Sequence, residues 1–451
     1  MNEMQQTALD RMSELVIQNS HINSDISEKY DVKRGLRNSN GTGVLAGLSK
    51  IGEVHGYIVD DGEQVPDYGK LFYRGINIYD IVNGFQRDGR FGFEEVCYLL
   101  LFGMLPTERN LQEFSQFLGS LRDLPDDFSH NMILKAPSID IMNKLARSVL
   151  AAYSYDHDAD DISVQNIIKQ SMELIARFPT MLAYSYQAKA HYHGNKSLFI
   201  HKPRPDLSTA ENILTMIRPD CEYTKLEAEI LDLSLVLHAE HGGGNNSTFV
   251  TRVVTSAGSD TYSAIAAAIG SLKGPKHGGA NLKVMAMMED IKANVKNWDN
   301  REEISQYLTK IINKQAFDGS GLIYGMGHAI YTLSDPRAVL IKEKAIELAQ
   351  AKHHEEELNL YMTVEELTPE IFEKVKGSRK EISANVDFYS GFVYNILNIP
   401  RELYTPLFAV GRMPGWCAHR LEEQITGQRI IRPAYKSVVT KQRYVPMSDR
   451  D

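Results

Sequence analysis

Histidines on glycine-rich turns are the residues of this sequence best suited to chemistry on a bound substrate. His277 lies in the run Gly274-Pro-Lys-His-Gly-Gly-Ala-Asn281, directly ahead of a stretch with helical character. Glycine permits sharp turns and close approach by a ligand, and the positive end of a following helix favours a neutral imidazole that can donate a hydrogen bond. A lone histidine is more often a structural hydrogen-bonder, so both interpretations of His277 stay open.

A second histidine, His328, lies in the run Gly325-Met-Gly-His and precedes a turn at Asp335-Pro-Arg337. One use of this pattern is to polarise a substrate carbonyl with His328 while Arg337 binds a carboxylate through its planar fork. The alternative is a loop histidine followed by a surface arginine at the start of a helix. The residues alone leave the choice open.

One aspartate, Asp387, stands in apolar and aromatic surroundings between Val386 and Phe388. Such surroundings withdraw water from a carboxylate and raise its pKa toward the range of a useful general base. Aspartate is also a preferred N-cap, and residues 388–397 have a helical pattern. A structural role as a helix cap is therefore the competing hypothesis for Asp387.

The segment Leu237-His-Ala-Glu-His-Gly-Gly-Gly-Asn245 contains two more histidines, His238 and His241. Their spacing lacks the HExxH pattern of a zinc site, so we predict no metal. Arg412 and Arg432 add cations beside glycine and proline. Each arginine alone could simply solvate the surface, but a set of spaced arginines suits an anionic substrate.

The elements that must position these residues are mainly helices. Apolar residues recur at three- and four-residue spacing, which predicts a mostly α-helical fold with helices over Phe93–Gly103, Ile139–Tyr155, Ile162–Lys189, Glu227–Leu237 and Ala338–Leu348. Strand patterns are confined to Gly56–Asp60 and Lys70–Arg74, so any sheet should be small and peripheral. The charge-rich segment 285–380 indicates a smaller helical domain, with the candidate site in a cleft between two lobes.

Composition excludes several classes of protein. The chain has 451 residues, of which 43% are hydrophobic, so a large core and two or three domains are expected. The net charge of −9 disfavours nucleic acid as a partner. Cys97, Cys221 and Cys417 lack CxxC spacing and are expected to be buried free thiols. The longest apolar run, Val96–Leu105, is too short to span a membrane, and no signal peptide is evident, so we expect a soluble cytoplasmic protein.

Taken together, the four segments that carry His241, His277, His328 and Asp387 resemble the citrate synthase family, in which the same motifs occur in the same order. The resemblance extends over most of the chain. It implies a mainly α, two-domain helical fold with little β structure, and an intertwined homodimer that condenses acetyl-CoA with oxaloacetate. The large domain, with the dimer interface, would comprise residues 1–284 and 389–451, and the small domain residues 285–388.

The resemblance also implies roles for individual residues. Asp387 would remove a methyl proton of acetyl-CoA, His277 would donate a hydrogen bond to the thioester oxygen, and His328 would polarise the oxaloacetate carbonyl. The implied oxaloacetate ligands are His241, His328, Arg337, Arg412 and, from the second subunit, Arg432. The implied coenzyme A contacts are Leu322, Ile323, Tyr324, Gly325, Met326, Gly327, Lys380 and Arg37. No metal or other cofactor and no membrane partner is implied, and hydrolysis of a citryl-CoA thioester would complete the reaction.

Some features depart from the family or leave alternatives. Ala329 follows His328 where many bacterial relatives carry arginine, and the N-terminal region lacks the β-rich part of NADH-inhibited hexamers, which favours a simple dimer. Pockets for acetyl-CoA and propionyl-CoA differ by one methylene, worth about 1–3 kcal/mol, so a 2-methylcitrate synthase is the closest alternative. Alternatives of other classes are a non-catalytic regulator that binds CoA or dicarboxylates, and a metal-dependent hydrolase built on the histidines.

Overall fold

The chain divides into two compact units. The computed structural model describes residues 3–38, 42–60, 63–328, 330–377, 381–427 and 429–450, and the units are Met1–Leu48 and Ser49–Asp451. The first unit contains α1 (Glu3–Ser20), α2 (Ser24–Lys29) and the 3₁₀ turn η1 (Arg34–Leu36). Asn23 caps α2 by accepting a backbone N–H, and no side chain of α1 is buried. This unit carries Arg37, one of the predicted coenzyme A contacts.

The second unit begins with a three-stranded antiparallel sheet. Its strands are β1 (Gly52–Asp60), β2 (Glu63–Tyr73) and β3 (Ile76–Asn77), in the order β1-β2-β3. The predicted segment Gly56–Asp60 lies in β1, and Lys70–Arg74 lies in β2 except for Arg74, one residue beyond its end, so the expectation of a small sheet is confirmed. The sheet is anchored by Tyr73, whose hydroxyl donates to the Val236 carbonyl at 2.9 Å, close to the segment that carries His238 and His241.

Helices make up most of the second unit, which confirms the predicted mainly α fold. They are α3 (Ile78–Arg87), α4 (Phe93–Phe102), α5 (Glu108–Ser120), α6 (Ile141–Ala152), α7 (Val164–Gly194), α8 (Thr209–Ile217), α9 (Lys225–His238), α10 (Asn246–Ser256), α11 (Thr261–Lys273), α12 (Ala280–Asn294), α13 (Arg301–Ile312), α14 (Pro336–Lys352), α15 (Glu355–Lys376), α16 (Val386–Ile396) and α17 (Tyr404–Thr426). Single turns occur at η2 (Ser129–Leu134), η3 (Tyr153–Tyr155), η4 (Arg401–Leu403) and η5 (Met447–Asp449). The five helices predicted from periodicity correspond to α4, α6, α7, α9 and α14.

Several helices begin at residues whose side chains satisfy the free backbone N–H groups of the first turn. Thr224 and Glu227 form a capping box at α9. Asp335 caps α14, with Pro336 at the first helical position, where proline lacks only an N–H that would have no partner. Asn385 caps α16. The caps of α14 and α16 fix the starts of the two helices whose first turns carry Arg337 and Asp387.

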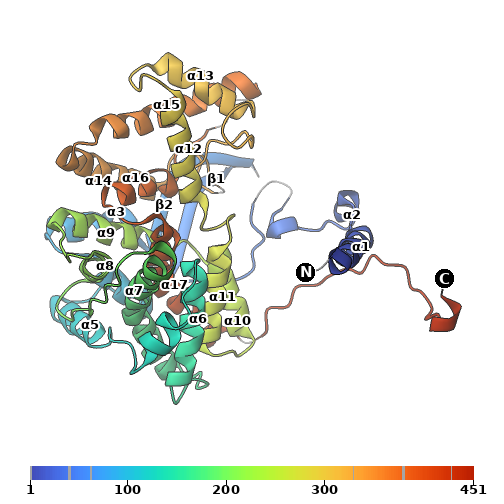
Figure 1. The fold of residues 1–451 in the computed structure, drawn as a ribbon, viewed down its shortest axis with the longest axis horizontal. Helices are drawn as coiled ribbons and strands as arrows, with labels where there is room; N and C mark the ends of the chain where they lie inside the picture. The colour runs from blue at the N-terminus through green and yellow to red at the C-terminus, as the bar shows by residue number, and fades with distance from the viewer. Residues whose placement is uncertain are drawn as a thin grey trace. The chain divides into compact units, whose positions relative to one another are not determined.

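The helix α17 is the centre of the core. It packs against α4, α7, α9, α10 and α11, and Figure 1 shows it in the middle of the unit. Most of its residues are buried, and Trp416 and Arg412 are among the largest fully buried side chains. A charged residue at the centre of a helical core is unusual unless something balances its charge.

A second group of helices, α12 to α16, packs together at the other end of the unit. There α13 contacts α15, while α12 and α14 both contact α16. The predicted domain boundaries, at residues 284/285 and 388/389, fall inside α12 and α16. The division into a large and a small domain remains a prediction.

Two further observations concern the whole chain. Among the helices of the described residues, none combines the length and the apolar character that a membrane crossing requires.

Cys97 and Cys417 are buried free thiols as expected, but Cys221 is only partly buried, so the expectation was wrong for that residue. Cys221 follows α8 in a short loop, where less of the core covers it.

Candidate active site

The loop that carries His328 is fastened to the start of α16. Gly327 N–H donates to the Ser383 carbonyl at 2.7 Å. The side-chain amide of Asn385 donates to the Gly327 carbonyl at 2.9 Å, and its side-chain oxygen accepts the N–H of Asp387 at 3.0 Å. A single asparagine therefore holds both the histidine loop and the first turn of the helix that carries the aspartate.

Asp387 lies in the first turn of α16 without being its cap. The cap is Asn385, so the hypothesis that Asp387 is a structural N-cap is wrong. The residue is partly exposed, but its carboxyl group is enclosed, and burial raises the pKa of Asp387 to about 6. The positive charge of Arg337 partly offsets this rise and the negative charge of Asp335 adds to it. This pKa suits a general base near neutral pH.

The rings of His328, His241 and Tyr331 form a cluster. His328 stacks on Tyr331 with ring centroids 4.7 Å apart, and His241 meets His328 edge-on at 5.2 Å. The Nδ1 atom of His328 accepts the backbone N–H groups of Ile330 and Tyr331 at 3.1 and 3.2 Å. Because Nδ1 is an acceptor, the proton of the neutral ring is on Nε2, which leaves that nitrogen as a donor.

Arg337 is held rigidly beside this cluster. Its guanidinium makes two parallel contacts to the Asp335 carboxylate, at 3.0 and 2.8 Å, and lies 5.7 Å from the ring centre of Tyr331. Both charged residues are buried. Burial alone would lower the pKa of Arg337, but its contact with Asp335 holds the pKa above the ordinary value. Arg337 is a permanent cation with the rest of its donor fork available to an anion.

His277 lies on the turn before α12, as its glycines predicted. Its Nε2 atom is 3.1 Å from the hydroxyl oxygen of Ser247, which also accepts the indole N–H of Trp416 at 3.1 Å. Burial and the positive charge of Arg412 lower the pKa of His277 to about 4. The ring is therefore neutral at pH 7, as expected for a group that donates a hydrogen bond without transferring its proton.

Arg412 connects His277 to the rest of the site. Its guanidinium lies 5.0 Å from the ring centre of Phe408, whose ring also meets His277 and His238. Its Nε donates to the His238 carbonyl at 2.6 Å. The two Nη atoms of Arg412 are buried, and neither has a hydrogen-bond partner among the residues that the structure describes. A buried guanidinium with two such donors is suited to a carboxylate ligand.

His241 lies among the cations of this site. Burial lowers the pKa of His241 well below its ordinary value, and the positive charges of Arg337 and Arg412 act in the same direction. The predicted residues thus come together from five separate parts of the sequence. The arrangement offers an enclosed base, neutral imidazole donors and two buried arginines.

The predicted coenzyme A contacts are placed less tightly. Leu322 is 52% exposed and Ile323 is buried, while Met326 forms a β-bridge with Ala384. Gly325 has a φ of +79°, and a Cβ there would lie 2.8 Å from the ring of Phe388, so the loop requires glycine. These contacts position the loop.

Further predicted contacts lie outside this arrangement. The hydroxyl of Tyr324 donates to Asp318 at 2.8 Å. Lys380 lies outside the described residues. Arg432 is exposed in the segment that follows α17, and no hydrogen bond or ion pair of the described residues links it to the other predicted site residues. A cavity of about 390 Å³ near Arg218 is lined by none of the predicted site residues. The predicted cleft between two lobes therefore stays a prediction.

The sequence did not reveal several residues that shape this site. Ser247, Tyr331 and Asn385 were overlooked because each acts through contacts with distant segments. Of these three, Asn385 could most easily have been found from the sequence, since an Asn directly before a helical pattern is a capping signal. No group of three or more His, Cys, Asp or Glu side chains that could hold a metal ion occurs in the described part of the chain.

Comparison with known proteins gives consistent results. The sequence model described as "Citrate synthase, C-terminal domain" matches residues 39–434. A citrate synthase of Haloferax volcanii is 34% identical over 407 residues, which cover 89% of this chain and 94% of the relative. A protein of Corynebacterium glutamicum named 2-methylcitrate synthase 2 is 32% identical over 411 residues, with coverage of 89% and 94%.

Solved structures agree. The citrate synthase of Pyrobaculum aerophilum superposes with a TM-score of 0.72 at 30% identity, covering 90% of this chain and 94% of that one. The citrate synthase of Thermoplasma acidophilum, in a ternary complex with carboxymethyl coenzyme A and oxaloacetate, superposes with a TM-score of 0.75 at 26% identity. That match covers 93% of this chain and 99% of the other.

Proposed function

The chain belongs to the citrate synthase family, and we propose that it condenses acetyl-CoA with oxaloacetate and water to give citrate and CoA. The observation that carries the proposal is the enclosed carboxylate of Asp387, with its raised pKa, in a site that also contains neutral His277 and His328. Carbon acids are weak, so a desolvated base and hydrogen-bond donors must act together. Binding alone would not require such a base.

In the first step Asp387 removes a proton from the methyl group of acetyl-CoA. The electrons of the C–H bond move toward the thioester carbonyl, and His277 donates a hydrogen bond to its oxygen as the enol or enolate forms. This role needs the tautomer with the proton on Nδ1. The hydroxyl of Ser247 supports that tautomer when it donates to Nε2 of His277, an alternative to its contact with Asn245 at 3.0 Å.

In the second step the enol carbon attacks the ketone carbon of oxaloacetate. Nε2–H of His328 polarises the ketone oxygen, and Arg337, Arg412 and His241 bind the substrate. Two buried arginines offer full positive charges where water does not screen them, which suits a dianion despite the net negative charge of the chain. Water then cleaves the citryl-CoA thioester, releasing citrate and CoA. The groups named suffice for these steps, so we propose that no cofactor takes part.

The active unit is proposed to be a homodimer in which Arg432 reaches the site of the partner. Support comes from the exposure of Arg432 and from its segment, since the described residues 429–446 contain neither helix nor strand and so could extend to another subunit. The proposed setting is the tricarboxylic acid cycle in the cytoplasm. The cycle follows from the reaction proposed, and the preference for acetyl-CoA over propionyl-CoA tests it.

The closest alternative is a 2-methylcitrate synthase, and a relative of that name covers most of the chain. The deciding measurement is release of free thiol by the purified protein with oxaloacetate and either acetyl-CoA or propionyl-CoA. A higher kcat/KM for acetyl-CoA supports the proposal, and a higher value for propionyl-CoA replaces it with the alternative. Binding of oxaloacetate without thiol release from either substrate would instead favour the non-catalytic regulator.

A further inference from the structure

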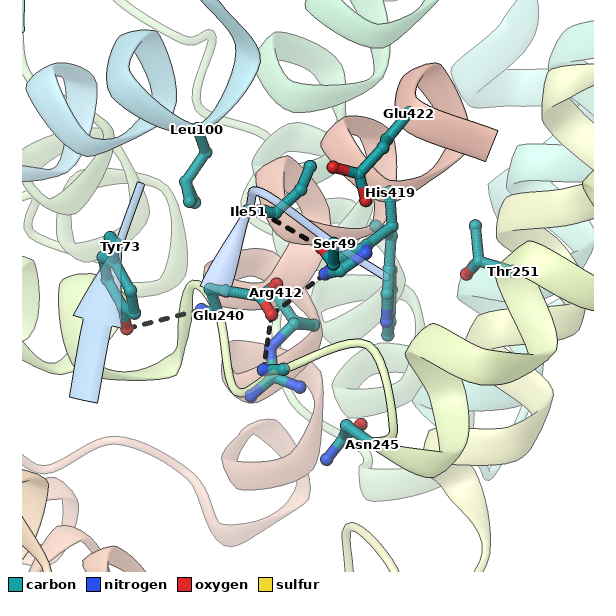
Figure 2. A network of polar contacts seen from close by, with 12 residues as sticks. Ser49, Ile51, Tyr73, Leu100, Glu240, Asn245, Thr251, Arg412, His419 and Glu422 are labelled. Atoms are coloured by element: carbon teal, nitrogen blue, oxygen red, sulfur yellow. Dashed lines mark hydrogen bonds and ion pairs between the residues drawn. The ribbon is translucent and has the colours of Figure 1, made fainter. Parts of the chain in front are cut away.

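A buried carboxylate that the mechanism does not use lies next to the oxaloacetate site. Glu240 stands between His238 and His241 in sequence and is 0% exposed. Figure 2 shows its side chain between His419 and Arg412, two residues of α17. Burying an acidic residue completely costs free energy of folding unless its charge is paired, so its contacts should show which groups balance the charge.

One oxygen of Glu240 is held away from the site by two donors. Its Oε1 accepts the backbone N–H of Gly242 at 2.5 Å and Nε2 of His419 at 2.9 Å. The ring of His419 presents Nε2–H because its Nδ1 accepts the guanidinium of Arg252 at 3.1 Å. Burial alone would raise the pKa of Glu240, but His419, Arg412 and the Gly242 N–H hold it below its usual range, so the carboxylate is ionised.

The second oxygen of Glu240 lies beside Arg412 without pairing with it. A Cβ built at Gly415 would lie 2.8 Å from Glu240 Oε2 and 3.3 Å from Arg412 Cδ, so both groups border the same gap on α17. Oε2 has no hydrogen-bond partner among the described residues, and neither do the two Nη atoms of Arg412. Two opposite charges are thus neighbours in the core, and each keeps an unused hydrogen-bonding group.

We propose that Glu240 is a positioning residue that balances the charge of Arg412 in the empty site while His419 prevents it from occupying the arginine's fork. This inference rests on the proposed function, in which Arg412 binds oxaloacetate. The carboxylate lowers the cost of keeping a guanidinium buried before substrate arrives. If it were released from His419, it would rotate over Gly415, pair with Arg412 and compete with the substrate carboxylate.

The test is a set of substitutions at the buried residues Glu240 and His419. Calorimetry measures the dissociation constant of oxaloacetate for each variant, and thiol release measures kcat and KM. His419→Leu removes the donor at nearly constant volume and frees Glu240. The expected result is binding of oxaloacetate weaker by about tenfold or more, because a buried ion pair must first be broken. His419→Gln keeps a donor for Glu240 and an acceptor for Arg252, and it should bind within about threefold of wild type.

The double variant Glu240→Gln/His419→Leu separates this inference from a purely structural role. Removing the competing charge should restore binding to within about threefold of wild type, although the protein carries one more substitution in its core. A double variant that binds oxaloacetate no better than His419→Leu would overturn the inference. So would unchanged binding by His419→Leu.

Two further outcomes are also decisive. If His419→Leu does not fold, Glu240→Gln alone decides: it should lower the melting temperature without substrate but bind oxaloacetate at least as tightly as wild type, because a repelling charge is gone. Binding weaker by about tenfold would refute the inference. Failure of the wild-type protein to bind oxaloacetate would overturn the proposed function, and this inference with it.

Discussion

Replacing Asp387 by asparagine should lower turnover and stabilise the fold at the same time. The substitution keeps the shape of the side chain and removes its charge. Since a positioned general base contributes about 10²- to 10⁴-fold to a rate, kcat should fall by that factor, while the affinity for oxaloacetate stays nearly unchanged. The cap of α16 stays in place, because Asn385 accepts the backbone N–H of residue 387.

The gain in stability can be worked from the pKa. Burial raises the pKa of Asp387 from 3.8 to about 6, so ionisation in the folded state costs about 3 kcal/mol at pH 7. A negative charge in the first turn of a helix offsets up to about 1 kcal/mol of this cost. Asp387→Asn should therefore raise the free energy of unfolding by about 2 kcal/mol at pH 7. Because the folded pKa lies above the unfolded one, the gain shrinks as pH falls from 6 toward 4.

The assay is chemical denaturation of both proteins at pH 7.5 and pH 4.5, at equal protein concentration. Asp80→Asn is the matched control, because Asp80 is an exposed acid in the first turn of α3, which also has an asparagine cap. That control should lose a few tenths of a kcal/mol or less. Normal turnover by Asp387→Asn, or a stability equal to wild type at pH 7.5, would refute the account of Asp387 as an enclosed base.

The other predictions concern pH, two overlooked residues and the second subunit. The kcat/KM of the wild-type protein should rise with pH through about 6, where Asp387 ionises in the free enzyme, and a flat profile from pH 5 to 8 would contradict this. Asn385→Ala should cost about 1 kcal/mol of stability and also lower kcat, whereas a capping role alone would leave kcat unchanged. Ser247→Ala should lower kcat more than it changes the KM for oxaloacetate, because its hydroxyl contacts His277, Trp416 and Asn245 rather than the proposed oxaloacetate ligands. Arg432→Ala should bind oxaloacetate weakly, and hybrid dimers with an Asp387→Asn subunit should regain activity if the arginine acts across the interface.

Much of the fold could be predicted because helical periodicity is a local signal. The pattern over residues 162–189 predicted α7 despite Pro179 inside it, and in the structure the helix continues to Gly194. The predicted boundary fell short because the last turn is polar and exposed, so the apolar pattern stops before the helix does. The short strands were found for the same reason, since β1 and β2 adjoin turns with clear signals.

The site was predicted in part. Histidines on glycine turns and an aspartate in apolar surroundings have sequence signatures, but the partners that set their protonation do not. Tyr331 stacks on His328 and Glu240 balances Arg412 only after the chain has folded, and the second pair joins segments more than 170 residues apart. The mistaken cap hypothesis for Asp387 shows a related limit, because both Asn385 and Asp387 are capping residues by type.

The asparagine at position 385 has a consequence for protein engineering. Its one side chain ties the loop of His328 to the helix of Asp387, and thus the group proposed to act on oxaloacetate to the group proposed to act on acetyl-CoA. A library that makes room for a larger acyl group beside Asp387 by moving α16 would also displace His328 and weaken the proposed use of oxaloacetate. Selection for larger thioesters should therefore favour substitutions that shrink side chains around α16 and leave its backbone and Asn385 untouched.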